Sequence, residues 1–269
     1  MATLNGMISF SGKLGDLVFY NRGKTKAVRQ QVKSYQLSEN SKKSGRDFGA
    51  ASRTAAYIRA AFSSLVKRYA DGDLVNRLNK RVMEIFKSIP KEHAGNKKLI
   101  DGNLGQLRGF EFNIATPLSK LLFQPLGVKI QSHGILELEF SKTKLEQFVR
   151  VIPKASCAVL QVMVFNFELD GEHCELIKVN DMEIPLNLTD FPGAKLTLKT
   201  TQKGARALII ALGISYLSKG ILNEDKRYYG CQISHAWHLQ DGVEVKFITL
   251  VEEKIEVVEK VGGISWEMG

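Results

Sequence analysis

Apolar residues in the first third of the chain recur at steps of three and four, the spacing that places them on one side of an α-helix. The pattern predicts two amphipathic helices, at residues 48–69 and 74–89, and Pro90 ends the second. Between them, Asp71-Gly72-Asp73 provides a break and an N-cap for the second helix. We therefore expect a helical hairpin over residues 47–93.

The pattern changes to alternation and long apolar runs over residues 94–269. The first part of this region is rich in glycine and contains GFEFNIA (109–115), which predicts a strand. Two apolar runs, residues 157–169 and 205–218, predict long buried strands. Two Asp-Gly pairs mark hairpin turns, and the strands follow one another without long helices between them. These features indicate a mainly antiparallel β-sandwich or barrel, so the expected fold class is α+β.

The N-terminal residues indicate a small β-hairpin followed by a polar arm. Residues 17–32 contain a short apolar run, turn residues and an alternating basic segment, which together predict a hairpin with much of its positive charge on one face. We also expect a short strand at residues 7–10 and a turn at residues 11–15. Residues 33–46 are rich in Ser, Lys and Gly and predict an exposed linker, so the hairpin and arm together occupy residues 1–46. A hairpin this small has little core of its own and is expected to dock against another surface.

The same hairpin contains Gly23-Lys24-Thr25, which is the ending of a phosphate-binding loop. Such a loop also needs a glycine upstream of its Gly-Lys pair, because successive backbone N–H groups wrap the phosphates. Here that position is Val18, a residue type that disfavours the positive φ of such a cradle. We therefore interpret the segment as a basic hairpin rather than a nucleotide site.

Composition places the chain among soluble globular proteins, with 44% hydrophobic and 25% charged residues. No apolar run approaches the roughly 18 residues needed to span a bilayer. The first residues lack a basic segment followed by a continuous apolar stretch, so no secretory signal is expected. The three cysteines, Cys157, Cys174 and Cys231, are widely spaced and fit a reducing cytoplasm. The sequence also leaves open that the protein is released from the cell by a signal-independent route.

The net charge of +10 is unevenly distributed along the chain. Residues 1–100 hold 20 Lys and Arg against 7 Asp and Glu, a net charge of +13, whereas residues 101–269 carry a net charge of −3. A solvated basic surface would explain this division, as would contact with a polyanion or with an acidic face of a neighbouring copy. For the last two alternatives, the candidate contact residues are Lys13, Arg22, Lys24, Lys26, Arg29, Lys33, Lys42, Lys43 and Arg46.

Candidates for catalysis and metal binding are few. No GxSxG or HExxH motif is present, so we assign no catalytic residue and expect neither an enzyme nor a bound cofactor or small-molecule substrate. His235 and His238 lie near Cys231 in the sequence. An odd spacing on a strand sends the two imidazoles to opposite faces, which is poor geometry for sharing one metal ion. We therefore expect no metal site.

Lys226, Arg227, Tyr228 and Tyr229 form a basic and aromatic cluster on a predicted loop. Aromatic rings beside cations are suited to stacking on the bases of single-stranded nucleic acid. Alternatively, two adjacent tyrosines are a partner contact or a partly buried anchor of the fold. The sequence leaves these interpretations open.

The start of the chain resembles an uncharacterised bacterial family. The pattern F-S-G-K-x-G-x-x-V, followed by a Gly-Lys pair and a basic residue, stands here as Phe10, Ser11, Gly12, Lys13, Gly15 and Val18, then Gly23, Lys24 and Arg29. A polar stretch, a short helical region, GFEFN (109–113) and a β-rich C-terminal domain follow in the same order as in that family. Since the family is a domain of unknown function, the resemblance implies this order of elements and no enzymatic activity.

Two functions are consistent with these patterns. In the first, a non-enzymatic structural protein docks its N-terminal hairpin and arm on a neighbouring subunit, and repeated contacts build a homo-oligomer or a filament. In the second, the basic third of the chain binds nucleic acid through phosphate contacts. Against the second, the hairpin lacks interleaved aromatic and basic residues, and no helix-turn-helix or zinc-finger spacing is present. We therefore predict self-assembly, with nucleic-acid binding as the alternative.

Overall fold

The computed structural model describes residues 2–3, 11–23, 25–31, 36–131, 134–169, 171 and 173–247. The chain divides into two compact units, Met1–Gly45 and Arg46–Gly269. The described residues combine helices with antiparallel sheets, which confirms the predicted α+β class.

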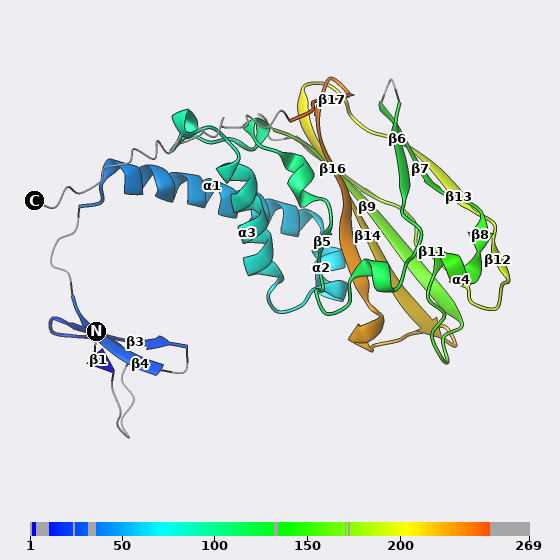
Figure 1. The fold of residues 1–269 in the computed structure, drawn as a ribbon, viewed down its shortest axis with the longest axis horizontal. Helices are drawn as coiled ribbons and strands as arrows, with labels where there is room; N and C mark the ends of the chain where they lie inside the picture. The colour runs from blue at the N-terminus through cyan, green and yellow to red at the C-terminus, as the bar shows by residue number, and fades with distance from the viewer. Residues whose placement is uncertain are drawn as a thin grey trace, which may run out of the picture. The chain divides into compact units, whose positions relative to one another are not determined.

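A four-stranded antiparallel sheet lies in the first unit (Figure 1). Its strands, in the order β1-β4-β3-β2, are β1 (Ala2–Thr3), β2 (Gly12–Leu14), β3 (Leu17–Arg22) and β4 (Thr25–Gln30). The predicted hairpin is confirmed as β3 and β4. The turn expected at residues 11–15 is wrong, because β2 occupies most of that segment and pairs with β3. The strand expected at residues 7–10 and the end of the hairpin at Val32 lie outside the described residues.

Two glycines make the tight turns of this sheet possible. A two-residue turn that begins at Gly15 joins β2 to β3, and Gly23 directly follows the last residue of β3. The φ angles of these glycines are +56° and +61°, which the turns of a twisted hairpin require and which glycine adopts without steric cost. Thr25 begins β4 rather than a helix, so this Gly-Lys-Thr sequence belongs to a hairpin and not to a phosphate loop.

The helices that follow are α1 (Glu39–Ala61), α2 (Ser63–Tyr69) and α3 (Leu74–Lys87). Because α1 begins at Glu39, the exposed linker expected at residues 33–46 is wrong from residue 39 onward. Ser38 accounts for the early start, since its Oγ accepts a hydrogen bond from the backbone N–H of Ser41 at 3.2 Å, as an N-cap does. The sequence interpretation took the Ser, Lys and Gly content as a linker and missed this cap.

The predicted helical hairpin is present, with two differences. The first predicted helix is interrupted at Phe62, which separates α1 from α2. Asp73 occupies the N-cap position of α3 as expected, but its side chain makes no cap hydrogen bond. Instead, the backbone N–H of Asp73 donates to Asp71 Oδ1 at 3.1 Å.

An eight-stranded antiparallel sheet is the central layer of the second unit. Its long strands β9 (Cys157–Glu168), β14 (Ala205–Ser218) and β16 (Gly230–Gln240) lie side by side in that order, and the first two confirm the long buried strands predicted from the apolar runs. The shorter strands are β5 (Phe110–Glu111), β10 (Cys174–Lys178), β11 (Met182–Pro185), β15 (Ile221–Leu222) and β17 (Val243–Glu244). Strand β5 is all that forms of the strand expected at residues 109–115.

Helices α1–α3 cover one face of the large sheet, and a three-stranded sheet covers the other (Figure 1). The smaller sheet, in the order β13-β7-β6, contains β6 (Gly127–Ile130), β7 (Ile135–Phe140) and β13 (Ala194–Lys199). One hydrophobic cluster joins the helices to the large sheet, for example Ile58 to Phe165, and a second joins the two sheets, for example Phe140 to Leu208. The two sheets form a β-sandwich, and the helices add a third layer.

This layering changes the expected division of the chain. Helical residues 47–93 share the first cluster with strands of residues 94–269, so both segments lie in one compact unit rather than in two. The remaining short elements are β8 (Thr143–Lys144), β12 (Asp190–Phe191), α4 (Leu145–Phe148), and the 3₁₀ turns η1 (Lys91–His93), η2 (Leu99–Asp101), η3 (Leu104–Leu107), η4 (Leu118–Lys120) and η6 (Lys226–Tyr228).

A glycine in the centre of the large sheet sets the distance of α2 from β14. A Cβ atom at Gly213 would lie 2.8 Å from the Tyr69 ring, so glycine lets that ring rest directly on the strand. The Tyr69 hydroxyl donates to Gln161 Oε1 of β9 at 2.8 Å. Helix α2 is thereby anchored to two neighbouring strands through one side chain.

Candidate functional site

One face of the N-terminal sheet gathers basic side chains around an aromatic ring. Residues paired across strands share a face of a sheet, so Lys13, Val18 and Arg29 lie together, with Tyr20 and Arg22 on the same side. The Arg29 Cζ atom lies 5.7 Å from the centroid of the Tyr20 ring, a cation–π contact. We call this surface the basic face. Its aromatic and basic residues interleave across the strands, which the linear sequence did not indicate.

Four apolar residues lie on the opposite surface of the same sheet, which we call the apolar face: Leu14, Leu17, Phe19 and Val28. The polar residues Asn21, Lys26 and Gln30 lie on the same side. Leu14 is 67% exposed and Leu17 is 43% exposed. Among the described residues of the first unit, Ala27 is the one that is buried. Among its described residues the sheet therefore has almost no core, as the sequence predicted for so small a hairpin.

The other predicted contact residues are not gathered on the basic face. Lys26 lies on the side of the apolar face, because it is two residues from Val28 along β4. Lys42, Lys43 and Arg46 are exposed in the first turns of α1, and Lys42 makes a 2.7 Å ion pair with the acidic residue that begins the helix. Lys24 and Lys33 lie outside the described residues.

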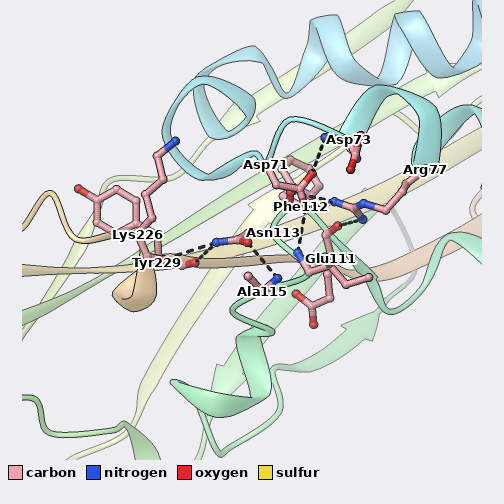
Figure 2. Close-up of polar contacts among 10 residues, drawn as sticks. Asp71, Asp73, Arg77, Glu111, Phe112, Asn113, Ala115, Lys226 and Tyr229 are labelled. Carbon is pink, nitrogen blue, oxygen red and sulfur yellow. Dashed lines mark hydrogen bonds and ion pairs between the residues drawn. The ribbon is translucent and has the colours of Figure 1, made fainter. Parts of the chain in front are cut away.

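The GFEFN segment lies at the junction between helix α3 and the large sheet (Figure 2). Arg77 from α3 donates to the backbone carbonyl of Glu111 at 2.7 Å and to that of Phe112 at 3.2 Å. Its guanidinium carbon lies 5.3 Å from the centroid of the Phe110 ring. A single arginine thus binds three consecutive residues of the segment and holds them against α3.

Asp71 completes this junction from the turn before α3 (Figure 2). Its Oδ2 accepts from Arg77 Nη2 at 2.6 Å and from the backbone N–H of Ile114 at 3.0 Å. Burial raises the pKa of the Asp71 carboxyl, but the hydrogen bonds from Arg77 and Ile114 outweigh burial, so the pKa lies below its usual value. Asp71 is therefore ionised at neutral pH and bonded to both sides of the junction.

The two polar residues of the segment, Glu111 and Asn113, bind residues in or near β16. Glu111 accepts from Gln232 Nε2 at 2.6 Å and from the backbone N–H of Leu118 at 3.1 Å, and burial raises the pKa of its carboxyl. The Asn113 Nδ2 atom donates to the carbonyl of Tyr229 at 3.4 Å (Figure 2). These contacts all join parts of the chain, so the GFEFN segment fixes the fold at this point.

One residue of the cluster of Lys226, Arg227, Tyr228 and Tyr229 is an anchor of the fold. Tyr229 is buried, and its ring centroid lies 5.8 Å from that of Tyr69. Arg227 pairs with the carboxylate two residues before it at 2.6 Å, but its side chain and that of Lys226 are exposed. The interpretation as a partly buried anchor therefore holds for Tyr229.

The two histidines of β16 lie on opposite faces of the large sheet, as their spacing predicted. His235 is opposite Ile210 on the side of the smaller sheet, whereas His238 is opposite Ala207 on the side of the helices. The His235 ring stacks on Trp237, with centroids 4.9 Å apart. Within the part of the chain that the structure describes, no group of three or more His, Cys, Asp or Glu side chains is arranged to hold a metal ion.

No protein-family model, curated protein or solved structure matches this chain. The resemblance to a family of unknown function therefore stays a prediction from the sequence. None of the helices in the described ranges is long and apolar enough to cross a membrane. Of the surfaces described above, the N-terminal sheet carries two exposed leucines, Leu14 and Leu17, side by side on neighbouring strands.

Proposed function

We propose that this chain is a non-enzymatic structural protein that assembles through its N-terminal sheet, which docks on a neighbouring copy. The observation that carries the proposal is the exposure of Leu14 and Leu17, which are paired on the apolar face of the sheet. Fully burying a leucine such as Leu14 or Leu17 contributes about 1.5–3 kcal/mol. Covering the apolar face with a partner surface is therefore strongly favourable.

The charge division suggests which part of a second copy the sheet would contact. Residues 1–100 carry a net charge of +13 and residues 101–269 carry −3, so the N-terminal sheet is attracted to residues 101–269 rather than to the basic helices, although residues 46–269 taken together carry +4. A contact between two different surfaces of identical subunits is head-to-tail. Repetition of such a contact closes into a ring or continues as a filament.

The test compares the full chain with a double variant, Leu14→Ser and Leu17→Ser, by light scattering and negative-stain microscopy. We expect ordered oligomers of the full chain and mainly monomers of the variant, since the variant loses apolar area without changing charge. A matched control, Val243→Ser, alters an exposed residue of β17 that is 70% exposed, and it should assemble normally. A full chain that stays monomeric at high concentration and low salt would refute the proposal.

Nucleic-acid binding is the second candidate, favoured by the basic face. Lys13, Arg22 and Arg29 lie around Tyr20 there, an arrangement suited to phosphate contacts with a base stacked on the ring. A fluorescence titration with single-stranded DNA over a salt series tests it, because phosphate contacts give an affinity that falls steeply with salt. Absence of binding at low salt would remove this candidate.

A further inference from the structure

A cavity of about 270 Å³ lies against β16, close to its pairing with β5. The volume equals that of about nine water molecules at ~30 Å³ each, enough for a small organic molecule. Four leucines line it, among them Leu118 and Leu212, and its polar lining includes Arg108, Gln124 and His235. We call it the β16 cavity. Apolar walls with a few polar groups are typical of ligand pockets.

A β-bulge in β16 accounts for the position of His235. Ile210 of β14 is opposite His235, but the next residue, Ala211, is opposite Ile233, so Ser234 is an extra residue in the strand. A bulge of this kind changes the direction in which the neighbouring side chains project from the strand, and bulges are frequent beside active sites. No glycine, proline or other turn residue beside Ser234 marks this bulge in the sequence.

The hydrogen bonds at the bulge determine which nitrogen of His235 carries the proton. The Ser234 hydroxyl donates to the carbonyl of Ile210 at 3.2 Å, so its oxygen is left to accept from His235 Nδ1, which lies 3.2 Å away. Burial, together with the charge of Arg108, lowers the pKa of His235 to about 4, so the ring is neutral at pH 7. With Nδ1 protonated, Nε2 is a hydrogen-bond acceptor.

Gln124 supplies a second acceptor at the same cavity. Its Oε1 atom is buried and has no hydrogen-bond partner among the described residues. A buried polar atom without a partner costs about 1–3 kcal/mol, so a ligand donor gains a favourable hydrogen bond if the Gln124 side chain turns its Oε1 atom toward the cavity that it lines. Both His235 and Gln124 therefore favour a ligand that carries an N–H or O–H group.

Arg108 adds a positive charge at the cavity. Its side chain is exposed and makes no ion pair with the residues that the structure describes. The Glu111 carboxylate, which is near in sequence, is already bonded to Gln232 at 2.6 Å and to the N–H of Leu118. The guanidinium is thus available to an anion, for which its fork of donors is well suited.

We propose that the β16 cavity binds a small organic acid that carries a hydrogen-bond donor on an apolar body. The leucine walls bury the apolar body, Arg108 binds the carboxylate, and His235 Nε2 and Gln124 Oε1 accept from the donor. A hydroxylated aromatic acid combines all three features in a molecule of this size. The proposal is independent of self-assembly, because the first unit contributes no residue to the cavity.

The experiment titrates the full chain with 4-hydroxyphenylacetate and follows the imidazole signals of His235 by NMR, assigned with the His235→Gln variant. We expect a saturable shift of the Nε2 signal. Tyramine has the same ring and hydroxyl but a positive charge in place of the carboxylate, and it should cause no such shift. The absence of a saturable shift up to about 10 mM, or an equal response to tyramine, would overturn the proposal.

Two variants localise the binding. Arg108→Gln should weaken it about tenfold or more, the effect of losing a charge-assisted hydrogen bond. Lys120→Gln is the matched control, because it removes an exposed cation from the neighbouring η4 turn without touching the cavity lining, and binding should be unchanged. Equal affinities of the two variants would assign the shift to a site other than the cavity and refute the proposal.

Discussion

Replacement of Arg77 by methionine should be among the most destabilising single changes in the second unit. The methionine side chain keeps an apolar contact with the Phe110 ring and removes the guanidinium. Three hydrogen bonds are lost, to Asp71, to the Glu111 carbonyl and to the Phe112 carbonyl. The Asp71 carboxylate then keeps the N–H of Ile114 but loses its cation while mostly buried.

The expected cost follows from the exposure of the pair. Breaking a fully buried ion pair by removing one partner costs about 3–5 kcal/mol, and a hydrogen bond to a charged group contributes about 1.5–3 kcal/mol. The side chains of Arg77 and Asp71 are each 22% exposed, so water compensates part of the loss. We therefore expect the R77M variant to lose about 3 kcal/mol of unfolding free energy.

Urea denaturation followed by circular dichroism measures this loss. A slope of about 1–3 kcal/mol per molar urea converts it into a midpoint lowered by at least about 1 M. The control is Lys80→Met on the same helix, where the side chain is exposed and the midpoint should hardly move. Equal midpoints for R77M and K80M would refute the view that the GFEFN junction anchors the helices to the sheet.

Three other changes test further parts of the fold. The pKa of Asp71 is depressed, so its stabilising contribution exists above the unfolded pKa of about 3.9 and is lost as the pH falls through the folded value. The cost of R77M, measured in urea, should therefore shrink progressively as the pH is lowered below about 3.9. Gly213→Ala should lower the unfolding free energy by about 1–3 kcal/mol because its Cβ meets the Tyr69 ring, whereas Gly45→Ala, in open space on α1, should slightly stabilise the helix. Deleting residues 1–32 should abolish oligomers in light scattering and leave the urea midpoint of the second unit unchanged, since exposed charges and a separate sheet contribute little to its core.

Much of the fold was predictable because its long elements have strong periodicity. The apolar runs of β9 and β14 are buried on both faces and admit few other interpretations. The N-terminal hairpin was predictable from its turn residues. The start of α1 was not, because a Ser cap within a Ser, Lys and Gly stretch looks like a linker until Ser38 is seen to bond Ser41.

The candidate sites were less accessible from the sequence, because they depend on which distant residues meet. The sequence analysis identified GFEFN only as a strand. In the structure, its Glu111 carbonyl accepts a hydrogen bond from Arg77 of α3, and its Asn113 side chain donates one to the carbonyl of Tyr229. The basic face arises from the register between strands, which places Lys13 and Arg29 on the two sides of Val18. A bulge at Ser234 has no local signature, so the β16 cavity had no counterpart in the sequence analysis.

The packing of helices on the large sheet has a consequence for synthesis of the chain. Phe62, between α1 and α2, packs on Phe165, and Tyr69 of α2 packs on Tyr229, so each residue precedes its partner by more than a hundred positions. At about 5–20 residues per second, the helices leave the ribosome at least about 5–20 s before the strands that cover them. During that interval the apolar side of the helices is open to chaperones and to other nascent chains. The yield of folded protein should therefore depend on how quickly the ribosome reaches β9, β14 and β16.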